Sequence, residues 1–266
     1  MNKQAYKIGV FDSGIGGLTV AKALKSEFPT IPIVYFGDTA HLPYGDKSKE
    51  AVISYCIKIG DFLVEKKCSH IVIACNTASA YGFKKLQSHL KGKAKVFNVI
   101  DPVVKYIASN YSKNKIGIIA TKGTTKSRVY PRKIVAIDKS IKVFSSATPL
   151  LAPMIEEGFF NNNISRTIIN NYLSKKELLQ IDVLILACTH YPLIEKIIKA
   201  FYNNEVHVIN SAKVLVLSLK SIFPKVSALK NKSDQFFVSD FTTSFQQSAK
   251  IFFGKSIKLT KKNIWK

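Results

Sequence analysis

Two segments of the sequence share one unusual pattern, an apolar run that ends in Ala-Cys and is followed by a polar turn. They span residues 71–80 (IVIACNTASA) and 184–194 (LILACTHYPLI). Short apolar runs rich in β-branched residues predict buried strands, and ligands of open α/β sheets bind at the carboxyl ends of such strands. Cys75 and Cys188 would then face one small ligand. One thiol could remove a proton from a carbon atom while the other returns a proton to the opposite face.

Both thiols could instead be inert, because free cysteine is among the most buried residue types. Their position at the junction between a strand and a polar turn favours a chemical role. A thiolate is a competent base, and a helix N-terminus lowers the pKa of a thiol from its usual value of about 8.5. We therefore expect Cys75 and Cys188 at the N-termini of helices, whose backbone amides could also hold a carboxylate.

Two further side chains could assist these thiols. Asp12 ends the first predicted strand directly before Ser13 and Gly14, and it is either the N-cap of the next helix or a functional carboxylate. His190 follows Cys188 by two residues, and it is either a surface histidine or a group that relays protons. The remaining histidines and cysteines show no metal-ligand spacing, so we expect no metal site.

Two glycine-rich turns and one short loop could bind an anion. Residues 12–19 (DSGIGGLT) follow a predicted strand but do not have the spacing of a dinucleotide fingerprint, and residues 121–127 (TKGTTKS) are not a Walker loop. The amides of residues 42–45 (LPYG) and the Tyr44 hydroxyl could hold a second carboxylate, although alone this loop would be merely a turn. We expect a small anionic ligand and no nucleotide.

Strand-like and helical segments alternate along the whole chain. The predicted strands are residues 7–11, 33–36, 70–74, 95–99, 115–120, 143–145, 183–187, 206–209 and 235–238. Helices are expected over residues 48–66, after Gly16 and from Pro192. Such alternation predicts an α/β fold with mainly parallel sheets flanked by helices.

The sequence also contains an internal repeat. Residues 7–13 (KIGVFDS) resemble residues 115–121 (KIGIIAT), and the two cysteine segments repeat at a similar offset. A duplicated unit would supply one strand-end hydroxyl and one strand-end thiol from each copy, around a single cleft. We predict two similar domains, the first formed by residues 1–98 with 211–266 and the second by residues 99–210.

Composition excludes several classes of protein. The chain of 266 residues is 47% hydrophobic and 21% charged, as expected of a soluble globular protein. No signal-peptide core or membrane span is visible, so we expect a cytoplasmic protein without a membrane partner. The net charge of +23 could indicate nucleic-acid binding, but the lysines are dispersed and only three basic residues are arginine. We expect weak, non-specific polyanion binding and no specific nucleic acid.

Six motifs, in their order along the chain, give the sequence a resemblance to glutamate racemases. They are FDSGIGGLTV, YFGDTAHLPYGDKS, ACNTASA, ATKGTTKS, PMIEEG and LACTHYPLI. The resemblance implies a cofactor-independent isomerase that interconverts L- and D-glutamate and supplies D-glutamate for peptidoglycan. It also implies two α/β domains related by a pseudo-twofold axis, with glutamate bound in the cleft between them. We further expect a homodimer.

The same resemblance implies roles for individual residues. Cys75 would be the base that acts on D-glutamate and Cys188 the base that acts on L-glutamate. Asp12 would assist Cys75, and His190, with Glu156 as its partner, would assist Cys188. His41 occupies a loop position that varies in the family. The implied substrate-binding positions are Asp12, Ser13, Pro43, Tyr44, Gly45, Asn76, Thr77, Thr121, Thr189 and His190.

Two alternative functions remain open on the sequence. A racemase of the wider superfamily could act on aspartate, although the residues Cys-Thr-His at 188–190 and the turn after Asp12 favour glutamate. A binding protein with inert cysteines could instead use its basic surface to bind nucleic acid.

Overall fold

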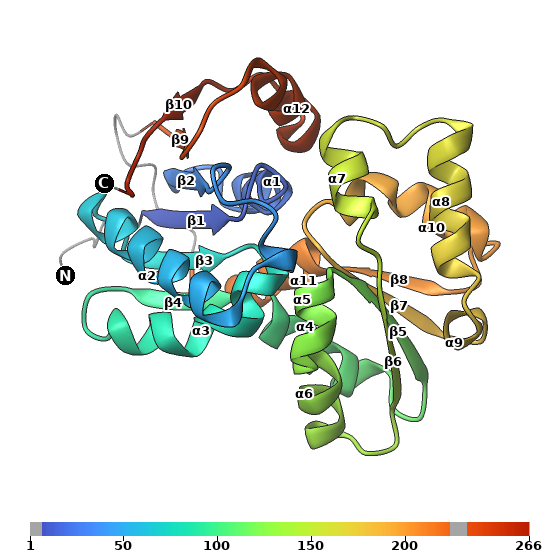
Figure 1. Cartoon of the computed structure of the whole chain (residues 1–266). Coiled ribbons are helices and arrows are strands. Elements are labelled where there is room, and N and C mark those ends of the chain that lie inside the picture. The colour runs from blue at the N-terminus through green and yellow to red at the C-terminus, as the bar shows by residue number, and fades with distance from the viewer. Residues whose placement is uncertain (1–6, 224–232, 266) are drawn as a thin grey trace.

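The computed structural model describes residues 7–223 and 233–265. Within them the chain forms two lobes, each built on a parallel sheet flanked by helices (Figure 1). The predicted α/β class is therefore confirmed. The strands are β1 (Ile8–Asp12), β2 (Ile33–Gly37), β3 (His70–Ile73), β4 (Lys95–Asn98), β5 (Lys115–Ala120), β6 (Lys142–Ala147), β7 (Val183–Ala187), β8 (His207–Asn210), β9 (Gln235–Val238) and β10 (Leu259–Lys261).

Four strands of the first sheet have the same order as the four strands of the second. The first sheet runs β10-β9-β2-β1-β3-β4, and the second runs β6-β5-β7-β8. Strand β5 therefore takes the place of β1, and β7 takes the place of β3, as the internal repeat predicted. All pairs in both sheets are parallel. The carboxyl ends of β1 and β3 meet at one edge of the first sheet, and those of β5 and β7 at one edge of the second.

Helices cover the sheets on both faces. They are α1 (Leu18–Glu27), α2 (Lys49–Glu65), α3 (Asn76–His89), α4 (Ile100–Asn110), α5 (Lys122–Ser127), α6 (Val129–Ile137), α7 (Leu151–Glu156), α8 (Asn163–Leu173), α9 (Lys176–Leu179), α10 (Glu195–Phe201), α11 (Ser211–Leu219) and α12 (Thr243–Phe253), with the short 3₁₀ helices η1 (Tyr44–Asp46) and η2 (Tyr191–Ile194). None of the described helices is long and apolar enough to cross a membrane.

Alternate residues of the first sheet belong to two different cores. Val10 and Val72 join a core with α1 and α11 that continues into the second lobe. Phe11 and Ile73 face the other way and pack with α2 and α3. Because successive strand residues point to opposite faces, a strand covered on both sides must be apolar throughout. This explains why β1, β3 and β7 have no alternation in the sequence.

Most predicted elements are present, with small shifts at their ends. Each of the predicted strands is a strand in the structure, displaced by about one or two residues at most. The helix predicted over residues 48–66 is α2, whose first turn is capped by the Ser48 side chain. Cys56 is buried on its inner face. Strand β10 was not predicted, because it has only three residues and two of them are polar.

The last part of the chain lies beside the beginning. Strands β9 and β10 extend the first sheet beyond β2. Helix α12 lies between the lobes next to α7 (Figure 1), and the Ser248 hydroxyl donates a hydrogen bond of 3.1 Å to the Glu156 carbonyl oxygen. The carboxyl-terminal segment therefore contacts the second lobe as well as the first sheet.

Candidate active site

A cavity of about 200 Å³ lies between the two lobes, where the strands of both sheets end. Its walls bring together almost all of the predicted site residues, which lie far apart in the sequence. Leu42, Ala152 and Glu157 also line it and were not predicted. The predicted residues in its walls are Ser13, Pro43, Tyr44, Gly45, Cys75, Asn76, Thr77, Thr121, Glu156, Cys188, Thr189 and His190.

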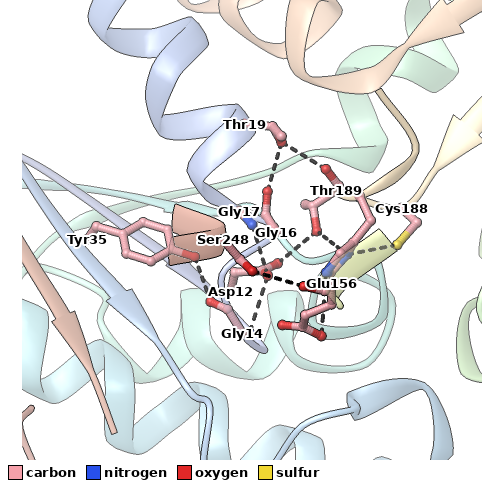
Figure 2. Close-up of polar contacts among 11 residues, drawn as sticks. Asp12, Gly14, Gly16, Gly17, Thr19, Tyr35, Glu156, Cys188, Thr189 and Ser248 are labelled. Atoms are coloured by element: carbon pink, nitrogen blue, oxygen red, sulfur yellow. Dashed lines mark hydrogen bonds and ion pairs between the residues drawn. The ribbon is translucent and has the colours of Figure 1, made fainter. Parts of the chain in front are cut away.

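Asp12 is the one predicted site residue outside the cavity wall. Its side chain is completely buried behind the glycine-rich turn that follows β1. Oδ2 of Asp12 accepts hydrogen bonds from the amides of Gly17 (3.0 Å) and Gly14 (3.3 Å). Oδ1 accepts one from the Thr189 hydroxyl in the second lobe, at 3.4 Å (Figure 2). Asp12 thus orders the start of α1 and also connects the two lobes.

Cys75 is the N-cap of α3, as predicted. Its Sγ accepts a hydrogen bond of 3.4 Å from the Ala78 amide. The expected fall in thiol pKa is nevertheless wrong. Burial and, after it, the negative charge of Asp12 raise the pKa of Cys75 to about 12, and the donors from Ala78 and Ser13 offset only part of this rise. The resting group at this wall is therefore a neutral thiol.

Cys188 directly follows β7 but does not begin an α-helix, so the predicted helix N-terminus at this thiol is also wrong. A 3₁₀ helix, η2, follows the turn, and the α-helix expected from Pro192 begins only at Glu195. Proline at position 192 has no N–H to donate to the Cys188 carbonyl oxygen. The Tyr191 amide donates to that oxygen instead, at 3.3 Å, which gives the tighter three-residue turn.

His190 lies between the second thiol and a carboxylate. Its Nδ1 is 3.6 Å from Sγ of Cys188, and its Nε2 is 3.7 Å from Oε2 of Glu156. The His190 side chain is only 7% exposed, which excludes the surface histidine considered from the sequence. Burial alone would lower the pKa of His190, but the contacts with Cys188 and Glu156 raise it well above its ordinary value. The geometry therefore favours an imidazolium beside Cys188.

Close packing fixes the His190 ring from two sides. The Phe252 ring of α12 meets it edge-on, with centroids 5.2 Å apart. On the other side lies Gly16, where a Cβ atom would overlap the imidazole. Position 16 must therefore be glycine for the turn after β1 to approach His190. In the sequence, Gly16 was only one of several glycines in this turn.

The cavity wall at the start of α3 contains a hydrogen-bond donor that no described group of the protein uses. Asn76 is buried; its Oδ1 accepts a hydrogen bond of 2.8 Å from the Tyr130 hydroxyl, while its Nδ2 has no partner among the described residues. The hydroxyls of Thr77 and Thr121 are 2.9 Å apart and join the two lobes. Tyr130 was not predicted, because its role depends on a contact between α6 and α3 that no local pattern indicates. A buried amide donor without a partner is suited to an anionic ligand.

These contacts define what the site can do. Two thiols carried by different lobes line one cavity, beside a histidine whose pKa is raised by its contacts with Cys188 and Glu156, and the Asp12 carboxylate behind the wall is fully buried. The interpretation of both cysteines as inert core side chains does not account for their place in the wall. Among the described residues no group of three or more His, Cys, Asp or Glu side chains could hold a metal ion.

Comparisons with known proteins agree with this geometry. Residues 19–219 match the family model described as Asp/Glu/Hydantoin racemase. A glutamate racemase of Aquifex pyrophilus is 41% identical over 249 residues, which cover 94% of each chain. The solved glutamate racemase of Francisella tularensis, in complex with D-glutamate, is 33% identical and has a TM-score of 0.90 over 98% of each chain.

More distant structures share only the fold. An aspartate racemase of Picrophilus torridus is 20% identical, covers 81% of this chain and 94% of its own, and has a TM-score of 0.60. The chain belongs to the Asp/Glu/Hydantoin racemase family, and the resemblance to glutamate racemases that its motifs indicated is confirmed.

Proposed function

We propose that the protein is a glutamate racemase that interconverts L- and D-glutamate by transferring protons between two thiols and the α-carbon, without a cofactor. The observation that carries this proposal is that Cys75 and Cys188, from different lobes, line one cavity of about 200 Å³. Relatives named glutamate racemase over most of the chain support the choice of substrate, as does the D-glutamate complex of the neighbour from Francisella tularensis.

In the proposed reaction each thiol serves one face of the α-carbon. With L-glutamate, the Cys188 thiolate removes the α-proton and the electron pair of the C–H bond passes to the α-carbon and its carboxylate. The Cys75 thiol then gives its own proton to the opposite face, which yields D-glutamate. The raised pKa of Cys75 supports its protonated form at the start of this direction. With D-glutamate the two thiols exchange roles.

The neighbouring groups are proposed to control the charge of each thiol. A His190 imidazolium next to Cys188 would stabilise the thiolate that removes the proton, and Glu156 would keep that histidine charged and oriented. The Asp12 carboxylate would favour the protonated form of Cys75. From behind the cavity wall it would also attract the positive charge of the substrate ammonium group.

The substrate-binding positions follow from the two walls. Asn76, Thr77 and Thr189 would bind the α-carboxylate and ammonium groups with Ser13 and Thr121, since all of them line the cavity beside the thiols. The loop at Pro43, Tyr44 and Gly45 would hold the distal carboxylate.

The domain boundaries, the cellular location, the oligomeric state and the metabolic role are also proposals. The domains would be residues 1–98 with 211–266 and residues 99–210, and the enzyme would be a cytoplasmic homodimer. Its D-glutamate would supply peptidoglycan synthesis.

A circular dichroism assay tests the proposed activity. Purified protein is incubated separately with L-glutamate, L-aspartate and L-glutamine, with no added metal or pyridoxal phosphate. We expect only L-glutamate to lose its optical signal. Turnover of aspartate at a similar rate would contradict the assigned substrate, and a requirement for added metal or pyridoxal phosphate would contradict the mechanism.

Glutamate should also stabilise the fold, because it would contact both lobes. Either enantiomer at 100 times its Kd should raise the free energy of unfolding by about 2.7 kcal/mol through mass action. Differential scanning fluorimetry would show this as a rise in the melting temperature, and glycine, which has no distal carboxylate, should give none. Equal shifts with glycine and glutamate would show that the loop at Pro43–Gly45 does not recognise a second carboxylate.

A further inference from the structure

The loop that carries Tyr44 is anchored to a single buried carboxylate. Asp38, which follows β2, is completely buried. Its Oδ2 accepts hydrogen bonds from the Tyr44 hydroxyl (2.6 Å) and from Nδ1 of His41 (2.9 Å). Its Oδ1 accepts one from the Ser239 hydroxyl, at 2.7 Å. Tyr44 lines the cavity, whereas Asp38 and His41 lie behind it.

The same loop is bonded to the carboxyl-terminal part of the chain. The Ala40 amide donates to the Ser239 hydroxyl at 2.9 Å, and the Asp240 amide donates to the Thr39 hydroxyl at 2.9 Å. Lys261 of β10 forms an ion pair of 2.6 Å with Asp240. The residues directly after β9, together with Lys261 of β10, therefore support the loop from the side away from the cavity.

An aromatic cluster completes this support. The His41 ring is stacked on Tyr55 of α2 and meets Trp265 edge-on, with centroid distances of 4.4 Å in both cases. Trp265 also meets Tyr55, at 5.4 Å. Its indole N–H is buried without a hydrogen-bond partner among the described residues, so ring contacts fix this side chain. The segment after β10 thus packs directly on the loop.

We infer that His41 and Trp265 are positioning residues for substrate binding. Through Asp38 and Tyr44 they hold the loop at Pro43–Gly45 in the conformation that receives the distal carboxylate. The inference rests on the proposed function, which assigns that carboxylate to this loop. A loop that is ordered before binding does not lose conformational freedom when the substrate arrives, so its affinity is higher.

The effect should fall on KM rather than on kcat. The distal carboxylate keeps its charge and position while the α-carbon reacts, so contacts with it stabilise the bound substrate and the transition state equally. Loss of such uniform binding raises KM and leaves kcat unchanged. A general loss of structure would instead lower kcat and the melting temperature together.

Steady-state kinetics of three variants test the inference. We expect Trp265→Ala and His41→Ala each to raise KM for both enantiomers of glutamate by at least about two- to tenfold, the range for a single ring pair, since each substitution removes two such pairs. We expect kcat to stay within about twofold. Trp265→Phe keeps an aromatic ring against His41, so its KM should stay close to that of the wild type. Tyr106→Ala, which removes a ring contact with Tyr111 in the second lobe, is the matched control and should leave KM unchanged.

Fluorescence gives a second readout that needs no turnover. Trp265 is the only tryptophan of the chain, so its emission reports on this cluster alone. The emission maximum of His41→Ala should differ from that of the wild type, because the substitution removes a ring that packs on the indole. Addition of D-glutamate should change the wild-type emission little, because the loop is already ordered before binding.

Two results would overturn these proposals in distinguishable ways. An active wild-type enzyme whose KM is unaffected by both alanine substitutions would contradict the positioning role alone, as would a large change in the wild-type emission when glutamate is added. A wild-type protein that neither racemises nor binds glutamate would contradict the proposed function, and with it this inference.

Discussion

Replacing either Cys75 or Cys188 with alanine is expected to abolish racemisation, with a loss well beyond the roughly 10²–10⁴-fold typical of one general acid or base. Each thiol is the base in one direction and the acid in the other, so both directions need both groups. Circular dichroism of L- and D-glutamate would measure the residual rate. Cys68→Ala is the control, because Cys68 is a buried free thiol that does not line the cavity.

The two alanine variants should differ in hydrogen exchange. With Cys188→Ala, the remaining Cys75 could still exchange the α-proton of D-glutamate with solvent deuterium without inverting the carbon. With Cys75→Ala, exchange should favour L-glutamate. Mass spectrometry of each enantiomer recovered from heavy water would show the difference, provided that the carbanion is reprotonated on the same face. Substantial racemisation by either variant would exclude the two-thiol mechanism, and reversed preferences would exchange the assigned faces.

The positions of both thiols could be predicted because their signals are local. Buried parallel strands require uninterrupted apolar runs, and the carboxyl ends of such strands are where ligands bind. β3 and β7 both have this pattern, and each delivers its cysteine to the same cavity. The match between residues 7–13 and 115–121 indicated a duplicated unit for the same reason, and β1 and β5 occupy equivalent places in the two sheets.

The electrostatics of the site could not be predicted from local patterns. The helix N-terminus at Cys75 suggested a lower pKa, but burial and the charge of Asp12 together outweigh it. Burial depends on how the two lobes meet, and no short segment encodes that. At Cys188 the signal was present but was misread, because Pro192 prevents the α-helical bond to the preceding carbonyl as well as favouring a first helical turn.

Contacts between distant segments also could not be predicted from the sequence. Tyr130 reaches Asn76 from another helix, and Asp38 gathers hydroxyls from residues 44 and 239. Asp38 stands within one of the motifs that identified the family, yet only the folded chain shows what it holds. Glu156 was placed near His190 solely through the family resemblance, and the distance of 3.7 Å between the two side chains agrees with that placement.

The two assisting groups should be separable by a matched pair of substitutions, His190→Gln and Asp12→Asn. Each removes a charge while keeping a polar side chain, and each should lower kcat/KM by about 10²-fold. The loss must be equal in the two directions, because the enantiomers are equally stable and their interconversion has an equilibrium constant of one. Overall rates therefore cannot show which thiol each group assists. Hydrogen exchange can, because it reports on one face at a time.

In heavy water His190→Gln should lose exchange at L-glutamate while keeping exchange at D-glutamate, since His190 contacts Cys188. Asp12→Asn should keep exchange at L-glutamate and change it at D-glutamate alone, because Asp12 is the charge that most affects Cys75. Removal of that negative charge favours the Cys75 thiolate, so the pKa of Cys75 should fall below about 12. The pH dependence of Cys75 alkylation in a Cys188→Ala background would measure this pKa.

Equal loss of exchange at both enantiomers in both variants would contradict these separate roles. His190 and Asp12 would then affect how the two lobes come together, and the hydrogen bond between Thr189 and Asp12 is a contact through which they could do so.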